Sequence, residues 1–339
     1  MKTITRRTFG AFALAASTML ASGTAYAADA IKVGLLSLTS HSPSIIAEAK
    51  GYFADQDLEV EFVTFQAAQP MAVAIASQDV DFGVTAISGG LISLAEKGVI
   101  KIIGGALQET PDVEGQKILV SKAAHDDGVT SPAMLKGRSF GITTTGSSFH
   151  YMAHKIADKE GFARSEIALK PLQKVPAVIA SLKSGQIDAW SIVPNIANAL
   201  TKGPEVVEIG KIADYIDSYQ VTTVFTSTAN TTDKPDLVKR FLAGYSKGVD
   251  DYNAALVDKT MSEDDTAAIV AMVHKYVYSD QPIEKADPRI RAGAMRINAN
   301  ARMNMASIND QLEWFKSEKL VPEDSSMENL VDTSFVETY

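Results

Sequence analysis

Residues 31–65 read IKVGLLSLTSHSPSIIAEAKGYFADQDLEVEFVTF, and this stretch decides the fold class. The apolar run 31–36 predicts a buried strand, and 42–53 predicts a helix with Ser42 at its N-cap and proline in its first turn. Residues 59–65 alternate polar and apolar side chains, which is typical of a second strand. Such a strand–helix–strand unit predicts parallel strands joined by a crossover helix.

The same alternation continues along the chain and then restarts. Further strands are expected at 81–85, 101–106, 139–143, 168–172 and 187–192, and helices at 69–77, 88–97, 148–161, 176–184 and from residue 194. Residues 72–83 resemble 178–190, which predicts two related lobes. The strand-like stretches 116–120 and 219–226 are candidates for two chain crossings, and the last third has helical spacing.

These patterns predict an α/β protein of two lobes joined by two crossings, with a helical C-terminal part. The expected division assigns 28–116 together with 227–339 to lobe one, and 117–226 to lobe two.

Composition excludes several classes of protein. The chain has 339 residues with 41 acidic against 32 basic side chains, and its net charge of −9 argues against a nucleic-acid-binding surface. Cysteine is absent, which excludes disulfides, thiolate metal sites and cysteine nucleophiles. No cofactor motif is found: the chain has neither a dinucleotide fingerprint nor a phosphate-binding loop.

The first 27 residues have the pattern of an export signal. Thr5-Arg6-Arg7-Thr8-Phe9 precedes a short apolar run, and Ala25-Tyr26-Ala27 offers a signal-peptidase site. The adjacent arginines favour the twin-arginine route. We therefore expect cleavage near Ala27 and a mature protein free in the periplasm.

Polar loops follow the predicted strands at the edge where ligands bind in open α/β sheets. Hydroxyls and free amides at helix N-termini suit a small anion, and Tyr151 or Trp190 offers an aromatic platform. Capping alone also explains such residues. The candidate ligand residues are Thr39, Ser40, His41, Gln66, Thr85, Ser88, Thr145, Gly146, Ser147, Ser148, Tyr151, Trp190 and Pro194.

The histidines give little support for metal binding or catalysis. His150 and His154 lie four residues apart on a predicted helix, but no third ligand is evident, so a solvated helix face is expected. His41 lies in a polar loop and is the better functional candidate. A Gly-x-Ser-x-Gly nucleophile turn is missing, and no enzymatic activity is expected.

Four motifs in order carry a family resemblance over about residues 31–250. They are Ser44-x-x-x-Glu48-Ala-Lys-Gly51-Tyr52-Phe53 followed by Leu58-Glu-Val, Gln78-Asp79-Val80-Asp81-Phe82-Gly83, Leu135-Lys136-Gly137-Arg138 with Thr145-Gly146-Ser147, and Ser184-Gly185-Gln186-Ile187-Asp188-Ala189. This arrangement resembles the nitrate/sulfonate/taurine-type periplasmic solute-binding proteins.

The resemblance implies a type II periplasmic-binding-protein fold that closes on a solute and delivers it to the permease and ATPase of an ATP-binding-cassette importer. It also implies a monomer that meets the membrane only through the permease, and it places the ligand loops on the candidate residues given above. The superfamily includes a pyrimidine-forming enzyme with a cysteine-rich motif, an activity not implied for a chain without cysteine.

Three functions remain open at this point. The first is binding of a small organic anion, a sulfonate or carboxylate, although the loops offer no obvious arginine clamp. The second keeps the fold but binds a pyrimidine or another vitamin-precursor heterocycle, stacked on Trp190 or Tyr151 with Gln66 and His41 at its edge. The third is an exported serine hydrolase that pairs a loop serine with His41 or His150.

Overall fold

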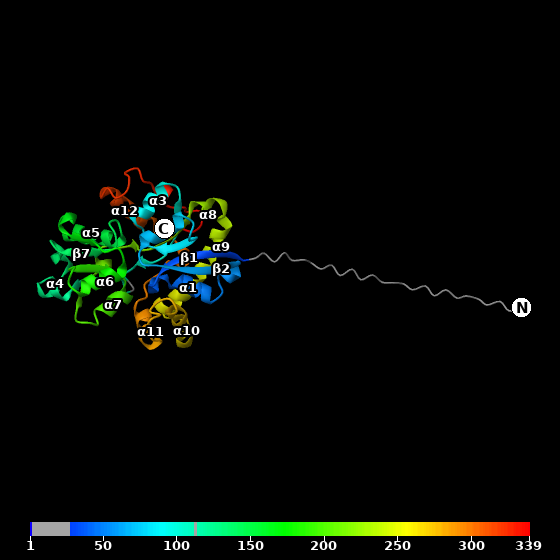
Figure 1. The fold of residues 1–339 in the computed structure, drawn as a ribbon, viewed down its shortest axis with the longest axis horizontal. Helices are drawn as coiled ribbons and strands as arrows, with labels where there is room; N and C mark the ends of the chain where they lie inside the picture. Colours follow the sequence, from blue (N-terminus) through cyan, green and yellow to red (C-terminus); the bar gives the residue numbers. More distant parts are fainter. Residues whose placement is uncertain (2–27, 112–113) are drawn as a thin grey trace.

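The computed structural model describes Met1 and residues 28–111 and 114–339 of the chain. The predicted export signal, apart from Met1, lies outside the described residues. Two five-stranded sheets form the centres of two lobes, drawn blue to cyan and green in Figure 1. Within 28–111 and 114–339, no helix is both long and apolar enough to cross a membrane.

The strands alternate with helices through most of the chain, as predicted. The strands are β1 (Asp29–Leu36), β2 (Leu58–Phe65), β3 (Phe82–Thr85), β4 (Ile100–Gly105), β5 (Gln108–Glu109), β6 (Lys117–Ser121), β7 (Ser139–Ile142), β8 (Ala168–Pro171), β9 (Ala189–Ile192), β10 (Val206–Lys211), β11 (Tyr219–Gln220) and β12 (Thr223–Ser227). The helices are α1 (Ser42–Ala49), α2 (Ala68–Ala76), α3 (Gly89–Glu96), α4 (Lys122–Asp126), α5 (Ser148–Glu160), α6 (Val175–Lys183), α7 (Pro194–Leu200), α8 (Thr228–Asp233), α9 (Pro235–Tyr252), α10 (Glu263–His274), α11 (Ile283–Ala292), α12 (Met305–Ser317) and α13 (Met327–Leu330).

The two sheets have the same design. The first sheet has the strand order β2-β1-β3-β12-β4, and the second has the order β8-β7-β9-β6-β10. In each sheet the first three strands are parallel and the fourth, β12 or β6, runs antiparallel to its neighbours. Between the sheets, β5 pairs with β11 in a short antiparallel ribbon.

The predicted internal repeat is visible in matching side-chain contacts. The Asp81 carboxylate accepts the Lys32 backbone N–H at 2.8 Å, and the Asp188 carboxylate accepts the Ser139 N–H at 2.7 Å, each across 49 residues of chain. Each aspartate precedes a buried central strand, β3 or β9, and binds a backbone N–H of the neighbouring strand, β1 or β7. The two lobes therefore repeat local interactions as well as topology.

Two boundaries differ from the sequence-based expectation. The helix predicted for 42–53 ends at Ala49, and Gly51 adopts a φ of +76° in the turns that follow. His41 occupies the N-cap of that helix, so Ser42 is its first residue and not its cap. The strand-like stretch 219–226 divides into β11, in the ribbon between the sheets, and β12, in the first sheet.

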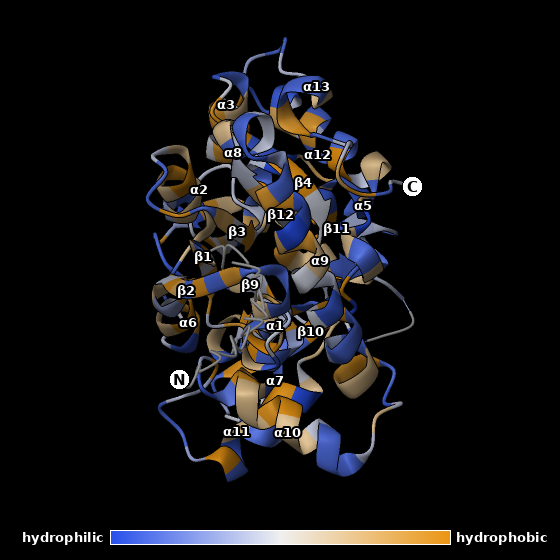
Figure 2. Cartoon of the chain, turned by 90° about the vertical axis from the view of Figure 1, so that its right-hand side faces the viewer, coloured by the Kyte–Doolittle hydropathy of each residue, from blue (hydrophilic) through white to orange (hydrophobic). Residues whose placement is uncertain are grey.

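The helical last third packs mainly on the first sheet, and Figure 2 shows helices there that mix hydrophobic and hydrophilic residues. One face of α9 is buried, including Phe241, whose ring stacks on that of Phe82 at 4.0 Å between centroids. On its far side Phe241 stacks on Phe53 at 5.3 Å. Burial of this aromatic column joins α9 to β3 and to the turn after α1.

Candidate functional site

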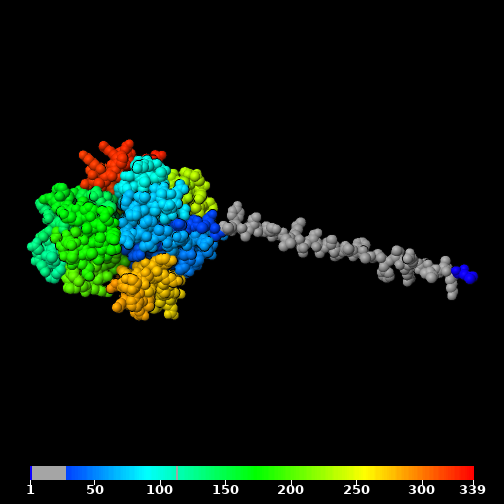
Figure 3. Space-filling model, viewed as in Figure 1, coloured from blue at the N-terminus to red at the C-terminus, as the bar shows by residue number. Residues whose placement is uncertain are grey.

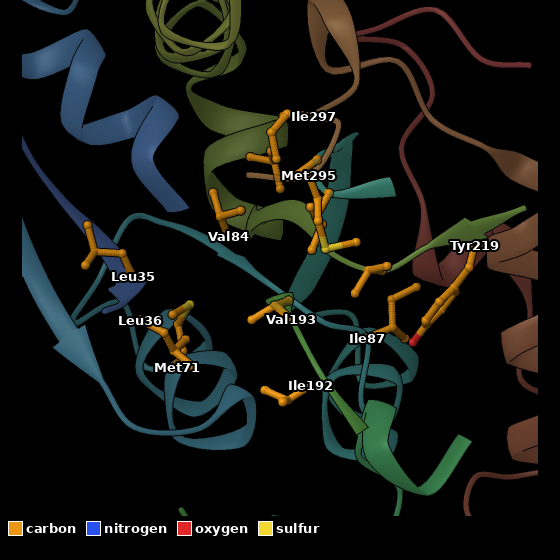
Figure 4. Packing of buried hydrophobic residues seen from close by; sticks show 14 of the residues in the cluster. Leu35, Leu36, Met71, Val84, Ile87, Ile192, Val193, Tyr219, Met295 and Ile297 are labelled. Atoms are coloured by element: carbon orange, nitrogen blue, oxygen red, sulfur yellow. The ribbon is translucent and has the colours of Figure 1, made fainter. Parts of the chain in front are cut away.

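A cavity lies between the two lobes. Its volume is about 60 Å³. One water molecule needs roughly 10–15 Å³ of such space, so the cavity has room for a few water molecules or a ligand of similar size. In Figure 4, Leu36 of β1, Ile192 of β9 and Val193 at the N-cap of α7 lie around the same cavity although they come from different lobes. The lining residues are Leu36, Leu38, Ser40, His41, Ala67, Ala68, Thr85, Ala86, Leu107, Gln116, Thr143, Ser147, Ser148, Phe149, Val175, Ile192, Val193, Val221 and Thr222.

Helices α1, α2 and α5 begin at this cavity, as do α6 at Val175 and α7 after Val193. The first three start at Ser42, preceded by the 3₁₀ turn Thr39–His41, at Ala68 and at Ser148. Among the residues that the structure describes, no side chain caps any of the three. The first N–H groups of α2 and α5 and the positive dipole ends of all three helices therefore remain available to an anionic or strongly accepting group, whereas at α1 the Ser42 N–H donates to the Thr39 carbonyl and Pro43 has no N–H.

Two serine hydroxyls also favour an anionic or strongly accepting group at this cavity. Ser40, before α1, and Ser147, before α5, are both 4% exposed and line the cavity from opposite lobes. Neither Oγ has a hydrogen-bond partner within the described part of the chain. An unpaired buried hydroxyl costs about 1–3 kcal/mol, so the two groups are placed for a ligand that offers hydrogen-bond acceptors.

His41 provides a third donor. The Leu36 backbone N–H donates to its Nδ1 at 3.3 Å, so the ring proton must reside on Nε2. Burial lowers the pKa of His41 from 6.5 to about 3, which keeps the ring neutral. None of the lining residues carries a formal charge at neutral pH, so the polar groups that the cavity offers are dipoles, neutral side chains and hydroxyls.

This burial predicts a pH-dependent stability. A histidine with a lowered folded-state pKa has no effect on stability well above 6.5 and destabilises the fold as the pH falls below that value, because the unfolded chain takes up the proton. At pH 5 the contribution of His41 is about 2 kcal/mol. Urea unfolding of His41→Asn should show a pH dependence between 7 and 5 that is shallower by about this amount. An unchanged slope would show that His41 is not held neutral.

Five of the thirteen candidate residues line the cavity. They are Ser40, His41, Thr85, Ser147 and Ser148. Two others lie beside the cavity and join the lobes through backbone hydrogen bonds: the Gly146 carbonyl accepts the Gly89 N–H at 3.0 Å, and the Gln66 carbonyl accepts the Val175 N–H at 3.4 Å.

The other six candidates have different surroundings. Thr39 is buried without lining the cavity, Thr145 is exposed, and Pro194 begins α7. Ser88 caps α3 by accepting the Leu91 N–H at 3.2 Å.

The two aromatic candidates are also set back from the cavity. Tyr151 donates to the Asp310 carboxylate of α12, and Trp190 is fully buried behind Phe149 at 5.4 Å between ring centroids.

Sequence reasoning missed several lining residues. Gln116 and Thr222 lie beside the crossings between the sheets, where strand-like spacing gave no indication of a ligand. Ala67, Ala68 and Val175 line the cavity where α2 and α6 begin. The side chains of alanine and valine do not indicate a ligand site, so these positions could be found only in the structure.

The expectation that His150 and His154 form a solvated face is wrong. Both are 4% exposed, and the indole of Trp314 from α12 packs edge-on against them at 5.0 and 5.6 Å between ring centroids. The His154 Nδ1 also lies 3.6 Å from Glu318.

Figure 3 shows the red C-terminal segment at one end of the junction between the green and blue–cyan lobes, and the orange segment at the other.

Residues 38–255 match the model of a protein family described as NMT1/THI5 like. No curated protein sequence matches the chain significantly.

Several solved structures resemble this one. A ligand-binding component of an ABC-type import system from Staphylococcus aureus, with zinc bound, is 14% identical, with a TM-score of 0.68 over 91% of this chain and 97% of that one. The alkanesulfonate-binding protein SsuA from Xanthomonas axonopodis pv. citri, bound to MOPS, is 16% identical, with a TM-score of 0.69 over 90% and 98%. The periplasmic nitrate-binding protein NrtA from Synechocystis is 13% identical, with a TM-score of 0.65 over 88% and 83%. These similarities confirm the predicted two-lobed periplasmic-binding-protein fold.

Proposed function

The chain belongs to the NMT1/THI5-like family, and from this premise we propose that it is a non-catalytic solute-binding protein for a small organic anion. The ligand is a sulfonate or a carboxylate held between the two lobes. Closure around the ligand produces the form that the permease of an ATP-binding-cassette importer recognises.

The observation that carries this proposal is the pair of unpartnered hydroxyls, Ser40 and Ser147, at the starts of two uncapped helices. Each hydroxyl can donate to an anion oxygen, both helix starts add a positive dipole end, and the start of α5 also adds backbone N–H groups. The small volume and the apolar wall of Leu36, Ile192 and Val193 favour a compact ligand with a short apolar body.

The similar structures support the same ligand class, because their names describe proteins that bind alkanesulfonate and nitrate. The heterocycle alternative has less support, since Trp190 and Tyr151 are set back from the lining. The proposal includes export through the twin-arginine signal, cleavage near Ala27, a periplasmic location and a monomeric state.

We further propose that the β5–β11 ribbon is the hinge. Residues 28–116 with 227–339 form lobe one and 117–226 form lobe two, except that β12 pairs within the first sheet and moves the second boundary to the turn between β11 and β12.

The function is tested by calorimetric titration and thermal unfolding of the mature protein with methanesulfonate, acetate and nitrate. Dimethyl sulfone, an uncharged analogue of methanesulfonate, is the matched control ligand. We expect saturable binding of at least one anion, and a ligand at a thousand times its Kd adds about 4 kcal/mol to the unfolding free energy. Equal binding of dimethyl sulfone and methanesulfonate, or binding of no anion, would contradict the proposal.

Removal of the two hydroxyls should weaken anion binding. Hydrogen bonds to a charged partner contribute about 1.5–3 kcal/mol, so Ser147→Ala should raise the Kd for methanesulfonate about tenfold or more, as should Ser40→Ala. Ser165→Ala, at an exposed position of the second lobe, is the control and should leave the Kd unchanged. Unchanged affinity in both cavity variants would show that the hydroxyls do not contact the ligand.

A further inference from the structure

Gly146 uses both of its backbone polar groups: its carbonyl links the two lobes, and its N–H is held within the second lobe. Its carbonyl accepts the Gly89 N–H at the start of α3 at 3.0 Å, and its own N–H donates to the His150 Nδ1 at 3.1 Å. Gly146 has a φ of +75°, which orients the two groups in this way and favours glycine. The next residue along the chain is Ser147, so whatever holds Gly146 also sets the position of that hydroxyl.

The hydrogen bond from Gly146 continues into two buried histidines and then a partly exposed ion pair. The His150 Nε2 lies 3.1 Å from the His154 Nε2, and the His154 Nδ1 lies 3.6 Å from a carboxylate oxygen of Glu318. The other oxygen of Glu318 pairs with Arg164 at 2.6 Å.

The proton positions follow from this order. Because the Gly146 N–H occupies the lone pair of His150 Nδ1, the proton of His150 is on Nε2 and donates to the Nε2 of His154. The proton of His154 is then on Nδ1 and faces Glu318. In this tautomer the Trp314 indole N–H, 3.3 Å from the His154 Nδ1, faces a proton. The opposite tautomer would let the indole donate to Nδ1 but would put two protons between the nitrogens 3.1 Å apart, which is the closer of the two repulsive contacts.

The surroundings keep both rings neutral. Burial, followed by the charges of His154 and Arg164, lowers the pKa of His150 to about 3. Burial also lowers the pKa of His154, with Glu318 and Asp158 opposing that shift. The nearby charged groups on the packed elements are paired: Arg164 also pairs with Asp158, and Lys155 of α5 with Asp310 of α12.

A metal ion is the competing interpretation, since the donor atoms of His150, His154 and Glu318 lie within 4.8 Å of one another. Ligation through both Nε2 atoms would require the His150 proton to move to Nδ1, where that ring meets the Gly146 N–H. Arg164 also holds Glu318 and would repel a cation. The contacts therefore favour a hydrogen-bonded chain.

We propose that His150 is a positioning residue for ligand binding: through Gly146 it holds the loop that presents Ser147 to the cavity and that contacts the other lobe. His154 and Glu318 set the tautomer in which His150 can do so. This inference rests on the proposed function of the cavity.

The test compares two substitutions that differ in one acceptor. His150→Asn keeps an oxygen near the position of Nδ1, whereas His150→Leu removes the acceptor. We expect His150→Leu to raise the Kd for methanesulfonate about tenfold or more and His150→Asn to stay within about threefold, since 1.4 kcal/mol corresponds to a factor of ten. His125→Asn, a half-buried histidine of the same lobe, is the control and should behave as the unsubstituted protein.

Hydrogen exchange at the Gly146 amide reports on the same bond without ligand. Protection should be lost in His150→Leu and retained in His150→Asn and His125→Asn, a pattern that a general loss of packing does not produce. In the unsubstituted protein the Kd for methanesulfonate should stay constant from pH 8 to pH 5, because His150 remains neutral in that range.

Each outcome has one meaning. Unchanged protection and unchanged Kd in His150→Leu overturn the positioning role and leave the proposed function intact. Failure of the unsubstituted protein to bind any anion overturns the proposed function, while the exchange data still decide whether His150 holds the loop. A rise in Tm with zinc chloride that is abolished in His154→Asn would show a metal site and overturn the hydrogen-bonded chain.

Discussion

Replacement of Gly146 by valine should raise the Kd for methanesulfonate about tenfold or more, whereas the same replacement at Gly137 should leave the Kd unchanged. Both glycines have nearly the same backbone conformation, with φ of +75° and +77°. Both substitutions therefore introduce the same backbone strain, of about 1–2 kcal/mol or more for a side chain in the left-handed region.

The surroundings of the two glycines differ. A Cβ at Gly137 would meet nothing within 4 Å, whereas at Gly146 it would lie 3.4 Å from the Gly89 nitrogen and 3.5 Å from the Phe315 ring. The methyl groups of valine extend beyond that ordinary contact, so they must separate Gly146 from Gly89 and open the lobes at the cavity.

Alanine provides a graded control, because its Cβ stops at van der Waals contact. Gly146→Ala should share the loss of stability but retain more affinity than Gly146→Val. Calorimetry measures the affinity of both valine variants, once urea unfolding has shown that their unfolding free energies match. Equal losses of affinity in Gly146→Val and Gly137→Val would show that backbone strain, and not the contact between the lobes, is responsible.

Phe241→Ala should reduce the unfolding free energy by about 3–5 kcal/mol, the largest effect on stability that we expect from a single substitution here. Phe241 is fully buried, and its ring lies between those of Phe82 and Phe53 with ring planes within 5° and 11° of parallel. Truncation removes the centre of this column and leaves a cavity among the buried side chains.

Phe62→Ala is the matched control. Phe62 lies on β2, is only partly buried, and has one aromatic neighbour, Tyr276, at 5.2 Å. We expect a loss below about 2 kcal/mol, because less apolar surface is exposed by that change. Urea unfolding measures both values, and similar losses would show that the aromatic column contributes no more than an ordinary surface phenylalanine.

Local periodicity predicts most of the strands and helices of this fold because each depends on neighbouring residues. The alternation at 59–65 and the helical spacing of Leu237, Val238, Phe241 and Leu242 are confirmed as β2 and α9. The division of 219–226 into β11 and β12 was not predictable, since both parts have the same strand-like composition and only pairing partners separate them.

The site is less predictable than the fold. Ser40 and Ser147 could be found because a serine before a helix is a recognisable pattern, but Ser88 has the same pattern and caps its helix instead. The burial of His150 depends on Trp314, far along the chain, and no local signal connects the two. Long-range packing decides which polar residues of a pattern line the cavity.

The fourth strand of the first sheet, β12, follows the whole second lobe in the sequence, and this has a consequence for the order of assembly. All five strands of the second sheet come from one continuous stretch, from Lys117 to Lys211, so that sheet can form as soon as this stretch has been synthesised. The first sheet begins at Asp29 but cannot place β4 until β12 arrives after the whole second lobe. The half of the protein that is synthesised first is therefore the half that finishes folding last.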